Sequence, residues 1–539
     1  MRMRAAAAGG LLSILLVLGV GPVSAQTTFV FGNPGEPVEL DPSVLVDTIS
    51  SRVTTQIFEG LVKYKGMTTE VVPALAEKWQ VSPDGEIWTF TLRRNVKFHD
   101  GTAFDASAVA WNFDRWRLST HPQHENKVKA GKSFEHFESQ FGGFDDKCII
   151  AKVEALSPTT VRFTLRSPLG PFLANLAMYN MGIASPKAVE KDGIEFGKHP
   201  IGTGPYKFVE WKAGQEVVLE ANPDYWDQAG RSRIPRLVIR NIKDNSQRLA
   251  ALKAGEIQGF EGLNPDDVKV VRADPNLQIL LRPTNTTGYV AFNYRVKEFQ
   301  DKRVRLAFAQ AINKKGIVDA LYGGTGMVAS QLQPPPLWGY NKSLQDYEYD
   351  PQRARDLLKE AGFGQGLKEI AWEDGKREPL QLWYMPVARP YFPNPKEIAE
   401  AIAADLAKAG IAVQLQTTDW TVYLDKRKNG QLPLYMLGWT GDNGDPDNFV
   451  CYFFCEPGIS REGFYANQPL ADLLLHAQTL TEQTKRAELY RKAEQIIHDE
   501  VVRIFIANNQ PPIPFQKRVR GYVPNPTAVE YFNTVSFAQ

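Results

Sequence analysis

The sequence contains little cysteine and little histidine: three cysteines and seven histidines among 539 residues. So few cysteines exclude a disulfide-dense scaffold, and Cys148, Cys451 and Cys455 do not supply a zinc site by themselves. Cys451 and Cys455 lie four positions apart. In an oxidising compartment they either form a disulfide or stay free thiols, and the sequence leaves both alternatives open.

An excess of one charge is absent as well, because 62 Lys and Arg residues are balanced by 61 Asp and Glu residues. Proteins that bind nucleic acid need a basic surface, so this balance argues against a nucleic-acid partner. The sequence shows neither internal repeats nor low-complexity segments. Its length exceeds the limit of about 250–300 residues for a single hydrophobic core and therefore predicts several domains.

Motifs for catalysis are also absent. The sequence contains no G-x-S-x-G and no H-E-x-x-H, and its cysteines and histidines do not pair as a nucleophile and its base. Gly131-Lys132-Ser133 resembles the end of a phosphate-binding loop, but Asn126 stands where that loop requires its first glycine. We therefore predict that the protein is not an enzyme.

Two stretches resemble metal sites only superficially. His121 and His124 lie in the polar stretch HPQHENK, which predicts a solvated loop rather than a metal site. Asp442, Asp445 and Asp447 do not follow the D-x-[DN]-x-[DN]-G spacing of a calcium loop, and no Glu stands at its twelfth position. The sequence thus predicts neither a bound metal nor a cofactor.

The first 25 residues have the pattern of a secretory signal peptide. Arg2 and Arg4 precede an apolar run at residues 11–20, which is too short to span a bilayer. Val23-Ser24-Ala25 fits the cleavage rule, so we expect cleavage before Gln26, with an uncleaved anchor as the alternative. No cysteine at the cleavage point offers an attachment site for lipid. The sequence predicts an exported chain without a lipid anchor.

Beyond the signal peptide, strand patterns alternate with helix patterns, which is typical of an α/β fold. Strands are predicted at residues 87–92, 161–165, 215–219 and 236–239. Helices are predicted at residues 302–313, 352–361 and up to 497. Asp301, Asp350 and Thr481 are the predicted N-caps of these helices, because short polar side chains satisfy the free N–H groups of a first turn.

Residues 380–450 carry the most informative pattern. It predicts a strand at 380–385, a helix at 395–409, a strand at 411–417, a helix at 421–427 and a strand at 434–439. Strands that are joined through helices in this way run parallel. Since ligands bind beyond the carboxyl ends of parallel strands, the loops that follow these three strands form a candidate ligand site.

The loops of this candidate site gather charged and aromatic side chains. Arg389 offers a planar, permanently charged group for a carboxylate, and Asp442 offers an acceptor for an ammonium group. Tyr391, Trp420 and Trp439 are candidate walls that exclude water. Each residue also has a structural alternative: Arg389 pairs with a surface carboxylate, Asp442 belongs to a turn, and the aromatic residues belong to the core.

Four segments carry a family resemblance: ALAEKWQVSPDGEIWTFTLRRNVKFHDGTAFD at 74–105, PIGTGPYKFVEWKAGQEVVLEANPDYW at 200–226, DKRVRLAFAQAIN at 301–313 and GWTGDNGDPDNF at 438–449. They resemble the extracellular solute-binding proteins of ABC importers, in the peptide/nickel family (family 5). The last segment, together with YMPVARPYFP at 384–393, is similar to the dipeptide-binding branch of that family.

The resemblance implies an α/β fold of the periplasmic-binding-protein type, with two lobes that close on a ligand by a hinge, and three domains. Residues 26–58, 200–288 and 506–539 would form a discontinuous domain I, residues 59–199 an inserted domain II, and residues 289–505 domain III. A receptor without a lipid anchor needs an outer membrane to retain it, so we expect this chain in the periplasm.

The resemblance also implies roles for site residues. Asp442 would hold the amino terminus of a peptide and Arg389 its carboxylate. The peptide would be contacted by Trp439, Thr440 and Gly441, with Tyr391 and Trp420 nearby. Two segments depart from the pattern of the dipeptide branch: residues 47–51, which would approach the ligand from domain I, and the residues after Phe449.

The implied function is that of a monomeric, non-catalytic receptor, which binds dipeptides between its lobes and delivers them to an ABC permease in the inner membrane. Relatives of this family carry other ligands, so haem, glutathione, oligopeptides and metal chelates stay open as alternatives. More distant alternatives are a secreted peptide hydrolase and a chaperone-like binder of unfolded segments.

Overall fold

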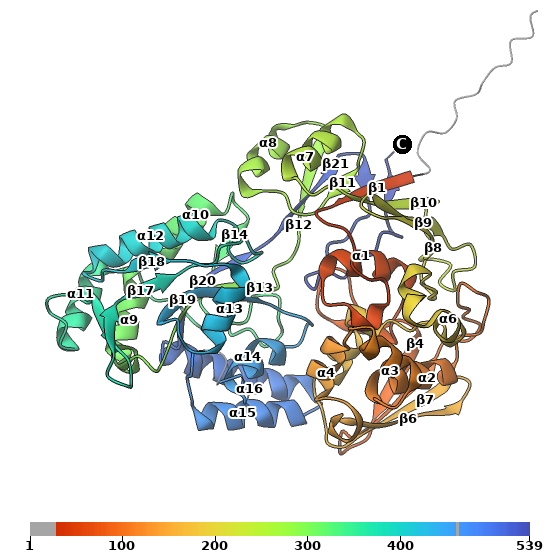
Figure 1. Ribbon diagram of the computed structural model, residues 1–539, viewed down its shortest axis with the longest axis horizontal. Helices are drawn as coiled ribbons and strands as arrows, with labels where there is room; N and C mark the ends of the chain where they lie inside the picture. The colour runs from red at the N-terminus through yellow and green to blue at the C-terminus, as the bar shows by residue number, and fades with distance from the viewer. Residues whose placement is uncertain (1–27, 457, 460–462, 539) are drawn as a thin grey trace, which may run out of the picture.

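The protein has two lobes (Figure 1). The computed structural model describes residues 28–456, 458–459 and 463–538, so the predicted signal peptide lies outside the described residues. The first lobe holds a seven-stranded and a four-stranded sheet, and the second lobe holds a six-stranded sheet. No helix in the described ranges is long and apolar enough to cross a membrane. The three-domain division stays a prediction.

The seven-stranded sheet of the first lobe takes strands from both ends of the chain. In sheet order they are β12 (Leu277–Leu281), β21 (Pro512–Gln516), β11 (Gly259–Phe260), β1 (Thr28–Asn33), β10 (Arg236–Asn241), β9 (Glu216–Ala221) and β8 (Tyr206–Lys212). β1 pairs in parallel with β10 and β11, and the other pairs are antiparallel. The helices of this part of the lobe are α1 (Thr48–Ile57), α7 (Asn245–Ala254) and α8 (Val268–Ala273). The last segment of the chain adds a separate two-stranded sheet of β22 (Val519–Arg520) and β23 (Ser536–Phe537).

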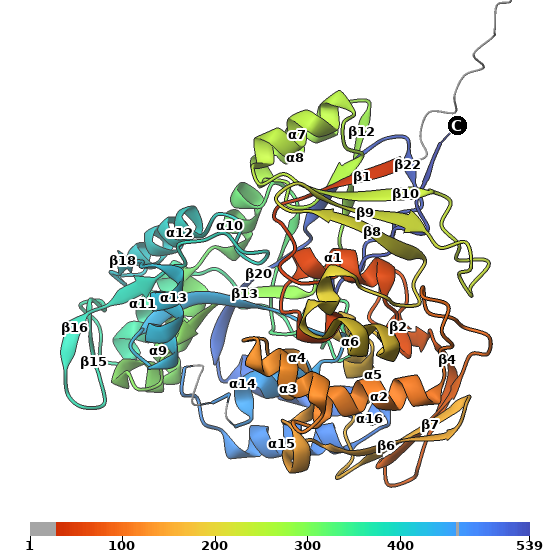
Figure 2. The same ribbon diagram turned by 45° about the vertical axis from the view of Figure 1, so that its right-hand side comes forward.

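The four-stranded sheet lies at the other end of the first lobe and is wholly antiparallel. Its strands are β4 (Ala76–Val81), β5 (Ile87–Leu92), β7 (Thr160–Leu165) and β6 (Ile150–Ser157), and β2 (Val62–Tyr64) pairs with β3 (Val71–Pro73) beside it. The helices around it are α2 (Ala106–Arg117), α3 (Pro122–Lys129), α4 (Glu135–Phe141), α5 (Phe172–Leu176) and α6 (Pro186–Asp192). Figure 2 shows α2 along one face of this sheet.

The six-stranded sheet forms the centre of the second lobe. In sheet order its strands are β14 (Gly326–Val328), β20 (Arg503–Asn509), β13 (Thr286–Phe292), β19 (Leu434–Thr440), β17 (Gln381–Trp383) and β18 (Gln414–Gln416). Helices surround it: α9 (Lys302–Ala311), α10 (Lys314–Leu321), α11 (Pro351–Glu360), α12 (Pro395–Lys408), α13 (Trp420–Lys428), α14 (Asp447–Phe454), α15 (Gln468–Thr479) and α16 (Gln483–Asp499). The hairpin of β15 (Glu369–Ala371) and β16 (Arg377–Pro379) completes the lobe. Every residue of β13 and β20 is buried, as expected of central strands.

Short 3-10 helices connect several of these elements. They are η1 (Pro42–Val44), η2 (Asp145–Lys147), η3 (Tyr179–Met181), η4 (Gly193–Lys198), η5 (Pro265–Asp267) and η6 (Lys297–Gln300).

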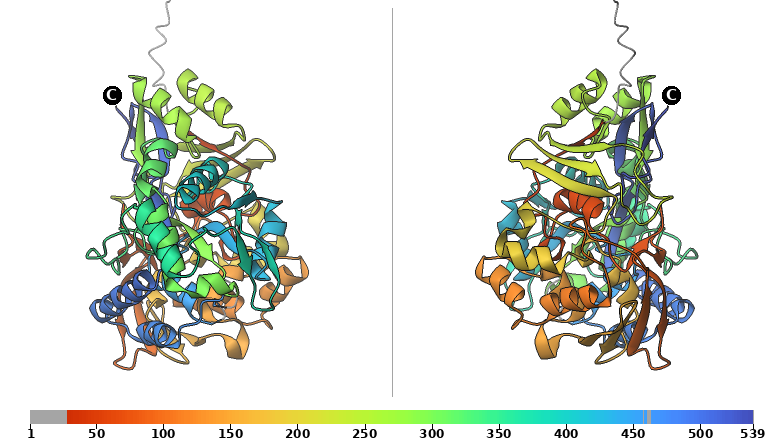
Figure 3. Two further views of the ribbon diagram at one scale, coloured as in Figure 1. Left: turned by 90° about the vertical axis from the view of Figure 1, so that its left-hand side faces the viewer. Right: turned by 90° about the vertical axis from the view of Figure 1, so that its right-hand side faces the viewer.

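Within the described residues, the chain passes between the lobes twice, and the two passages lie side by side. β12 continues through residues 282–285 into β13, and β20 continues through residues 510–511 into β21. β12 pairs with β21 in one lobe, and β13 pairs with β20 in the other. The Arg282 backbone N–H donates to the carbonyl oxygen of Pro511 at 3.0 Å, so hydrogen bonding continues between the passages. In the side views of Figure 3, the two passages, one green and one blue, run beside each other.

The sequence patterns locate most of these elements. The predicted strand at 87–92 is β5, and the predicted strands at 161–165, 215–219 and 236–239 are β7, β9 and β10 within two residues at either end. Asp301 and Asp350 cap α9 and α11 as predicted, each accepting a backbone N–H of the first turn. The alternation of strands and helices in 380–450 is confirmed, and β17 pairs in parallel with both β18 and β19.

Two local predictions were wrong. Thr481 does not cap the long helix: α16 begins at Gln483, and Glu482 takes the N-cap position without a side-chain hydrogen bond. The Thr481 methyl group instead packs against Gly85 of the first lobe, 3.1 Å from where a Cβ on that glycine would lie. His121 and His124 do not lie in a solvated loop. His121 caps α3, and the His124 ring is buried and stacked on Phe134 at a centroid distance of 4.5 Å.

The two cysteine alternatives are resolved in favour of the disulfide. Cys451 and Cys455 are bonded to each other at the end of α14, with their Cα atoms 4.8 Å apart. Cys148 is a buried free thiol in the first lobe.

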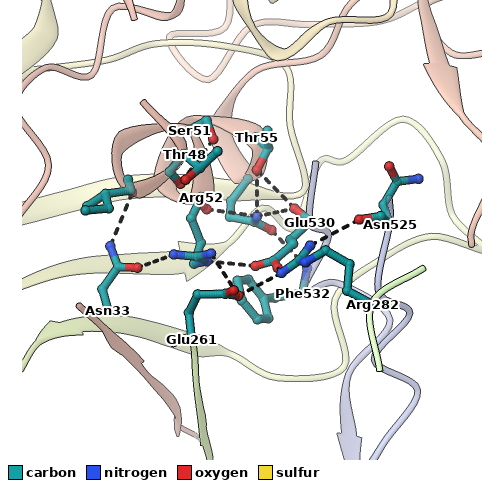
Figure 4. Close-up of polar contacts among 12 residues, drawn as sticks. Asn33, Thr48, Ser51, Arg52, Thr55, Glu261, Arg282, Asn525, Glu530 and Phe532 are labelled. Carbon is teal, nitrogen blue, oxygen red and sulfur yellow. Dashed lines mark hydrogen bonds and ion pairs between the residues drawn. The ribbon is translucent and has the colours of Figure 1, made fainter. Parts of the chain in front are cut away.

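A buried ion network anchors one passage between the lobes (Figure 4). Arg282, at the start of that passage, contacts the Glu530 carboxylate and donates to Glu261 at 2.7 Å. Arg52 of α1 donates to Glu530 at 2.7 Å and to Glu261 at 3.2 Å. Arg282 also donates to the backbone carbonyl of Asn525 at 3.1 Å. The network joins α1, the end of β11, the C-terminal segment and the passage into one unit.

Removing Arg282 should destabilise this unit strongly. Burial alone would raise the pKa of Glu530, but Arg52 and Arg282 hold it at about 2. Because a carboxyl group in an unfolded chain titrates near 4.3, this contribution to stability is present above that pH and is lost as the pH falls toward about 2. Arg282→Met should cost about 3–5 kcal/mol in urea unfolding at pH 7, because it leaves the buried Glu530 carboxylate with one cation fewer.

The matched control is Arg353→Met, which removes an exposed ion pair with Glu360 in the second lobe. It should change the unfolding free energy by less than about 1 kcal/mol. Equal effects of the two substitutions would contradict the role of the network.

Candidate functional site

The candidate site lies where three parallel strands of the second lobe end. β18, β17 and β19 are neighbours in that order, and the loops after their carboxyl ends carry Trp420, Arg389 and Asp442 respectively. The structure brings Arg389 and Trp420 into contact, with the guanidinium carbon 4.5 Å from the centre of the Trp420 ring. Arg389, in the loop after β17, and Trp420, at the start of α13, therefore build one positively charged corner of the candidate site.

Arg389 is held firmly but is left with unused hydrogen-bonding capacity. Its backbone N–H and carbonyl pair with those of Phe392 at 3.0 Å each, which closes a tight loop. Its Nε atom is buried without a hydrogen-bond partner, and no carboxylate among the described residues lies within ion-pair distance of it. The predicted alternative, in which Arg389 pairs with a surface carboxylate, is therefore not found among the described residues. A fixed guanidinium with free donors is suited to an external carboxylate.

Tyr391 supports the loop of Arg389 from inside the lobe. Its side chain is 7% exposed, and burial raises its pKa to about 12. Its ring lies against Gly438 of β19, and its carbonyl oxygen accepts a hydrogen bond from the Tyr322 hydroxyl at 2.9 Å. Trp420 begins α13 and stacks on Tyr423 with their ring centroids 5.7 Å apart.

A side chain that the sequence analysis had not singled out, Asn448, shapes the loop that follows β19. Its Oδ1 atom accepts hydrogen bonds from the Trp439 indole at 3.1 Å and from the Asp442 backbone N–H at 2.9 Å. Its Nδ2 atom donates to the Asp442 carboxylate at 3.2 Å. Trp439 also stacks on Tyr452, with centroids 4.1 Å apart. One asparagine in the first turn of α14 therefore fixes both Trp439 and Asp442.

Thr440 and Gly441 lead from β19 into this loop. Thr440 is exposed and faces Thr286 of β13 in the strand register. Gly441 exchanges two hydrogen bonds with Asn285, each 2.9 Å long. A Cβ at position 441 would lie 2.5 Å from the Phe449 ring, so only glycine fits there. The loop thus leaves the sheet at a defined angle.

The aspartates after Asp442 have structural partners. Asp445 accepts two hydrogen bonds from Arg486, each 2.7 Å long. Asp447 accepts from Gln478 at 2.8 Å and from the Tyr490 hydroxyl at 3.1 Å. Burial and the charge of Asp445 raise the pKa of Asp447 to about 6. In the described part of the chain, no group of three His, Cys, Asp or Glu side chains is placed to hold a metal ion.

The loop of Asp442 contacts the first lobe. The Asn443 side chain donates to Asn175 at 2.8 Å, and the Gly444 backbone N–H donates to the Tyr64 hydroxyl at 3.3 Å. Gly444 also packs tightly on Thr69, whose Cβ would lie 2.3 Å from a Cβ at position 444. The site is therefore formed between the two lobes, and Asp442 lies at their junction.

First-lobe residues that the sequence analysis missed lie near the loop of Asp442, where Asn443 donates to Gln140 of α4 at 3.3 Å. Burial raises the pKa of Asp442, while the nearby His136 and the hydrogen bond from Asn448 lower it. His136 lies on α4, and its Nε2 atom is 3.4 Å from the hydroxyl of Tyr179 in η3. No sequence pattern connects these residues to a loop about 300 positions away. Only the packing of the lobes brings them together.

Comparisons with known proteins match nearly the whole chain. The model of the family described as bacterial extracellular solute-binding proteins, family 5 middle, matches residues 70–461. The chain is 36% identical over 540 residues to the dipeptide-binding protein of Escherichia coli, with 97% of each chain covered. It is 34% identical to the heme-binding protein A of Haemophilus influenzae, with 95% of this chain and 93% of that protein covered.

A solved structure supports the same relationship. The ABC transporter-associated periplasmic binding protein DppA from Helicobacter pylori, in complex with the peptide STSA, is 31% identical to this chain and has a TM-score of 0.74. The match covers 95% of this chain and 98% of that one.

Gly438→Ala should disturb the loop that carries Arg389. An added Cβ would lie 2.3 Å from the Tyr391 ring, and a collision of this kind in a packed interior costs about 1–3 kcal/mol. The unfolding free energy in urea measures this cost. Gly364→Ala is the control, because its nearest neighbouring atom would be the Lys359 Cγ at 3.6 Å. A Gly438→Ala protein as stable as this control would contradict the packing described here.

Proposed function

Since this chain belongs to family 5 of the bacterial extracellular solute-binding proteins, we propose that it is the periplasmic receptor of an ABC importer for dipeptides. It binds a dipeptide between its lobes as a monomer, catalyses no reaction, and delivers the ligand to a permease in the inner membrane. The dipeptide-binding protein of Escherichia coli, similar over 97% of its length, supports this ligand class.

The observation that carries the proposal is the pair of opposite charges on neighbouring loops. Arg389 is braced on Trp420 and keeps a buried Nε without a partner among the described residues. Asp442 is oriented by Asn448 at the junction of the lobes. A dipeptide carries a carboxylate at one end and an ammonium group at the other. Arg389 holds the carboxylate and Asp442 holds the ammonium group.

Two fixed charges select ligand length. A ligand that is one residue longer moves one terminal charge away from its partner. Leaving one member of a buried charge pair without its partner costs about 2–5 kcal/mol, which is roughly 30-fold to several-thousand-fold in affinity. Side chains of the ligand make no such demand, so the receptor accepts many dipeptide sequences.

Ligand binding shifts the balance between open and closed lobes. The lobes are linked by two adjacent passages, which leaves rotation about residues 282–285 and 510–511 as the simplest motion. A ligand held by the second lobe and covered by the first stabilises the closed form, because only that form makes both sets of contacts. The closed form then docks on the permease.

Export follows from the first 25 residues, which have the n-region, apolar run and cleavage site of a signal peptide. Cleavage before Gln26 leaves a chain without a cysteine at its start for lipid attachment. The disulfide between Cys451 and Cys455 fits an oxidising compartment such as the periplasm.

A second candidate is a receptor for haem. It is favoured by His136, whose ring lies at the lobe junction beside Tyr179, and by the similarity to heme-binding protein A of Haemophilus influenzae. A histidine is a common ligand of haem iron. Glutathione, oligopeptides and metal chelates are further alternatives within the same receptor class.

Calorimetry tests the ligand class directly. The mature protein is unfolded and refolded to remove any retained ligand, then titrated with Ala-Ala, N-acetyl-Ala-Ala and Ala-Ala-Ala. We expect tight binding of Ala-Ala and a loss of about 30-fold or more for the other two. Failure of all three to bind would contradict the dipeptide proposal. A shift of the haem absorbance band on titration with hemin would then favour the second candidate.

Substitutions test the two charged anchors separately. Asp442→Asn should weaken binding of Ala-Ala by at least about 30-fold, because the ammonium group loses its charged partner. Arg389→Met should weaken Ala-Ala much more than its C-terminal amide, since the amide has no carboxylate to lose. The measurement is calorimetry of both variants with both ligands. Unchanged affinity in the first variant, or equal losses in the second, would refute the corresponding role.

A further inference from the structure

A pocket in the first lobe lies apart from the candidate site. It encloses about 280 Å³, and the described residues that line it all belong to the first lobe. They come from β2 and β3, from the residues that follow α1, and from the C-terminal segment 523–534. Sites for drug-sized molecules occupy about 300–1,000 Å³, so this pocket suits a small ligand.

β2 separates this pocket from the junction of the lobes. Lys63 of β2 lies opposite Val72 of β3, so the two side chains share one face of the strand pair, and both residues line the pocket. Successive side chains of a strand point to opposite faces. The Tyr64 hydroxyl accordingly reaches the other side, where it donates to the carbonyl oxygen of Ala174 at 2.9 Å and accepts the Gly444 N–H of the second lobe at 3.3 Å.

Apolar side chains form much of the pocket wall. Ala74, Pro205 and Val529 are buried, and Val72 is half-buried. Val523 also lines the pocket and is 38% exposed, which places it toward solvent. An apolar group that enters the pocket therefore leaves water for an apolar surface, which is favourable.

The carboxylate in the pocket wall, Glu59, already has partners. Its oxygens accept hydrogen bonds from three neutral donors: the Thr203 hydroxyl at 2.9 Å, the Tyr225 hydroxyl at 2.7 Å and the Trp226 indole at 2.8 Å. Burial raises the pKa of Glu59, and these hydrogen bonds lower it more than the charge of Lys63 does. Glu59 is thus held by the packing of the lobe.

Lys63 brings an unpaired positive charge to the pocket. Its ammonium group lies 5.8 Å from the centre of the Tyr531 ring, and no carboxylate in the described ranges lies within ion-pair distance of it. Lys65, the other lysine of the pocket, is exposed and pairs with Glu70 at 3.0 Å. A half-buried ammonium group beside apolar walls is suited to an anion with an apolar body.

We propose that this pocket is a second binding site of the protein, for a small apolar monocarboxylate. The carboxylate group of the ligand pairs with Lys63, and its apolar part lies among Val72, Val523 and Val529. A neutral ligand of the same shape lacks the ion pair and binds more weakly. The site does not depend on the proposed function, because it is built from the first lobe alone.

A titration followed by ligand-observed NMR tests the site. The refolded mature protein is titrated with 4-methylpentanoate and, separately, with the neutral 4-methylpentanamide. We expect saturable binding of the carboxylate and about tenfold weaker binding of the amide, because a charge-assisted hydrogen bond is lost. Equal affinities would overturn the ligand class, and no saturable binding of either probe would overturn the site.

Lys63→Met isolates the charge, because methionine keeps most of the aliphatic chain. We expect this variant to bind 4-methylpentanoate about tenfold more weakly than the parent protein. The matched control is Lys78→Met, which removes an exposed lysine of β4 that does not line the pocket. The control should bind the carboxylate as the parent does. Unchanged affinity in Lys63→Met, or equal losses in both variants, would overturn the role of Lys63.

Val72→Phe tests the location without changing a charge. The larger side chain projects into the pocket from the face that Val72 shares with Lys63 and reduces the space for a ligand. We expect both probes to lose binding, while a cooperative urea transition shows that the variant is folded. Full binding in the folded variant would overturn the location.

Arg389→Met separates this inference from the proposed function, because Arg389 is the cation of the candidate site. We expect 4-methylpentanoate to bind this variant as it binds the parent protein. Loss of probe binding in Arg389→Met, with binding kept in Lys63→Met, would place the probe in the candidate site and overturn the inference. Conversely, probe binding that depends on Lys63 in a protein that binds no dipeptide would support the inference while the proposed function fails.

Discussion

The two adjacent passages between the lobes are the constraint on which the rest of the structure depends. Because β12 and β21 pair in one sheet while β13 and β20 pair in the other, the lobes are joined by a narrow two-stranded ribbon. The ribbon is anchored at its first-lobe end by the Arg282–Glu530 ion pair. On the proposed function, closure rotates the two lobes about the few residues of this ribbon.

The loop after β19 has a double role. Asn443 and Gly444 contact Asn175 and Tyr64 of the first lobe, while Asn448 donates a hydrogen bond to Asp442, the residue before them. On the proposed function, contact between the lobes and contact with the ligand are thus made by consecutive residues. On the proposed function, a ligand needs to supply only the free energy that these contacts leave missing.

The sequence predicts which second-lobe loops meet at the candidate site and misses the first-lobe residues beside it, for a physical reason. Parallel strands, their helices and the loops at their carboxyl ends follow from local hydrophobic patterns, so Arg389, Trp420 and Asp442 were placed at one sheet edge correctly. Contacts between lobes leave no local pattern, and His136 and Tyr179 were missed. The predicted N-cap at Thr481 was wrong by one residue, because α16 begins at Gln483 with Glu482 in the N-cap position.

On the proposed function, the charges of Asp442 and Arg389 oppose closure of the lobes unless a ligand pairs with them. Asp442 lies at the junction of the lobes, and Arg389 Nε is buried without a hydrogen-bond partner among the described residues. Burial raises the pKa of Asp442 because water no longer stabilises its charge. An incoming ligand with opposite terminal charges removes these penalties at both ends. Because these charges disfavour the closed form when they are unpaired, closure of the lobes depends on the ligand.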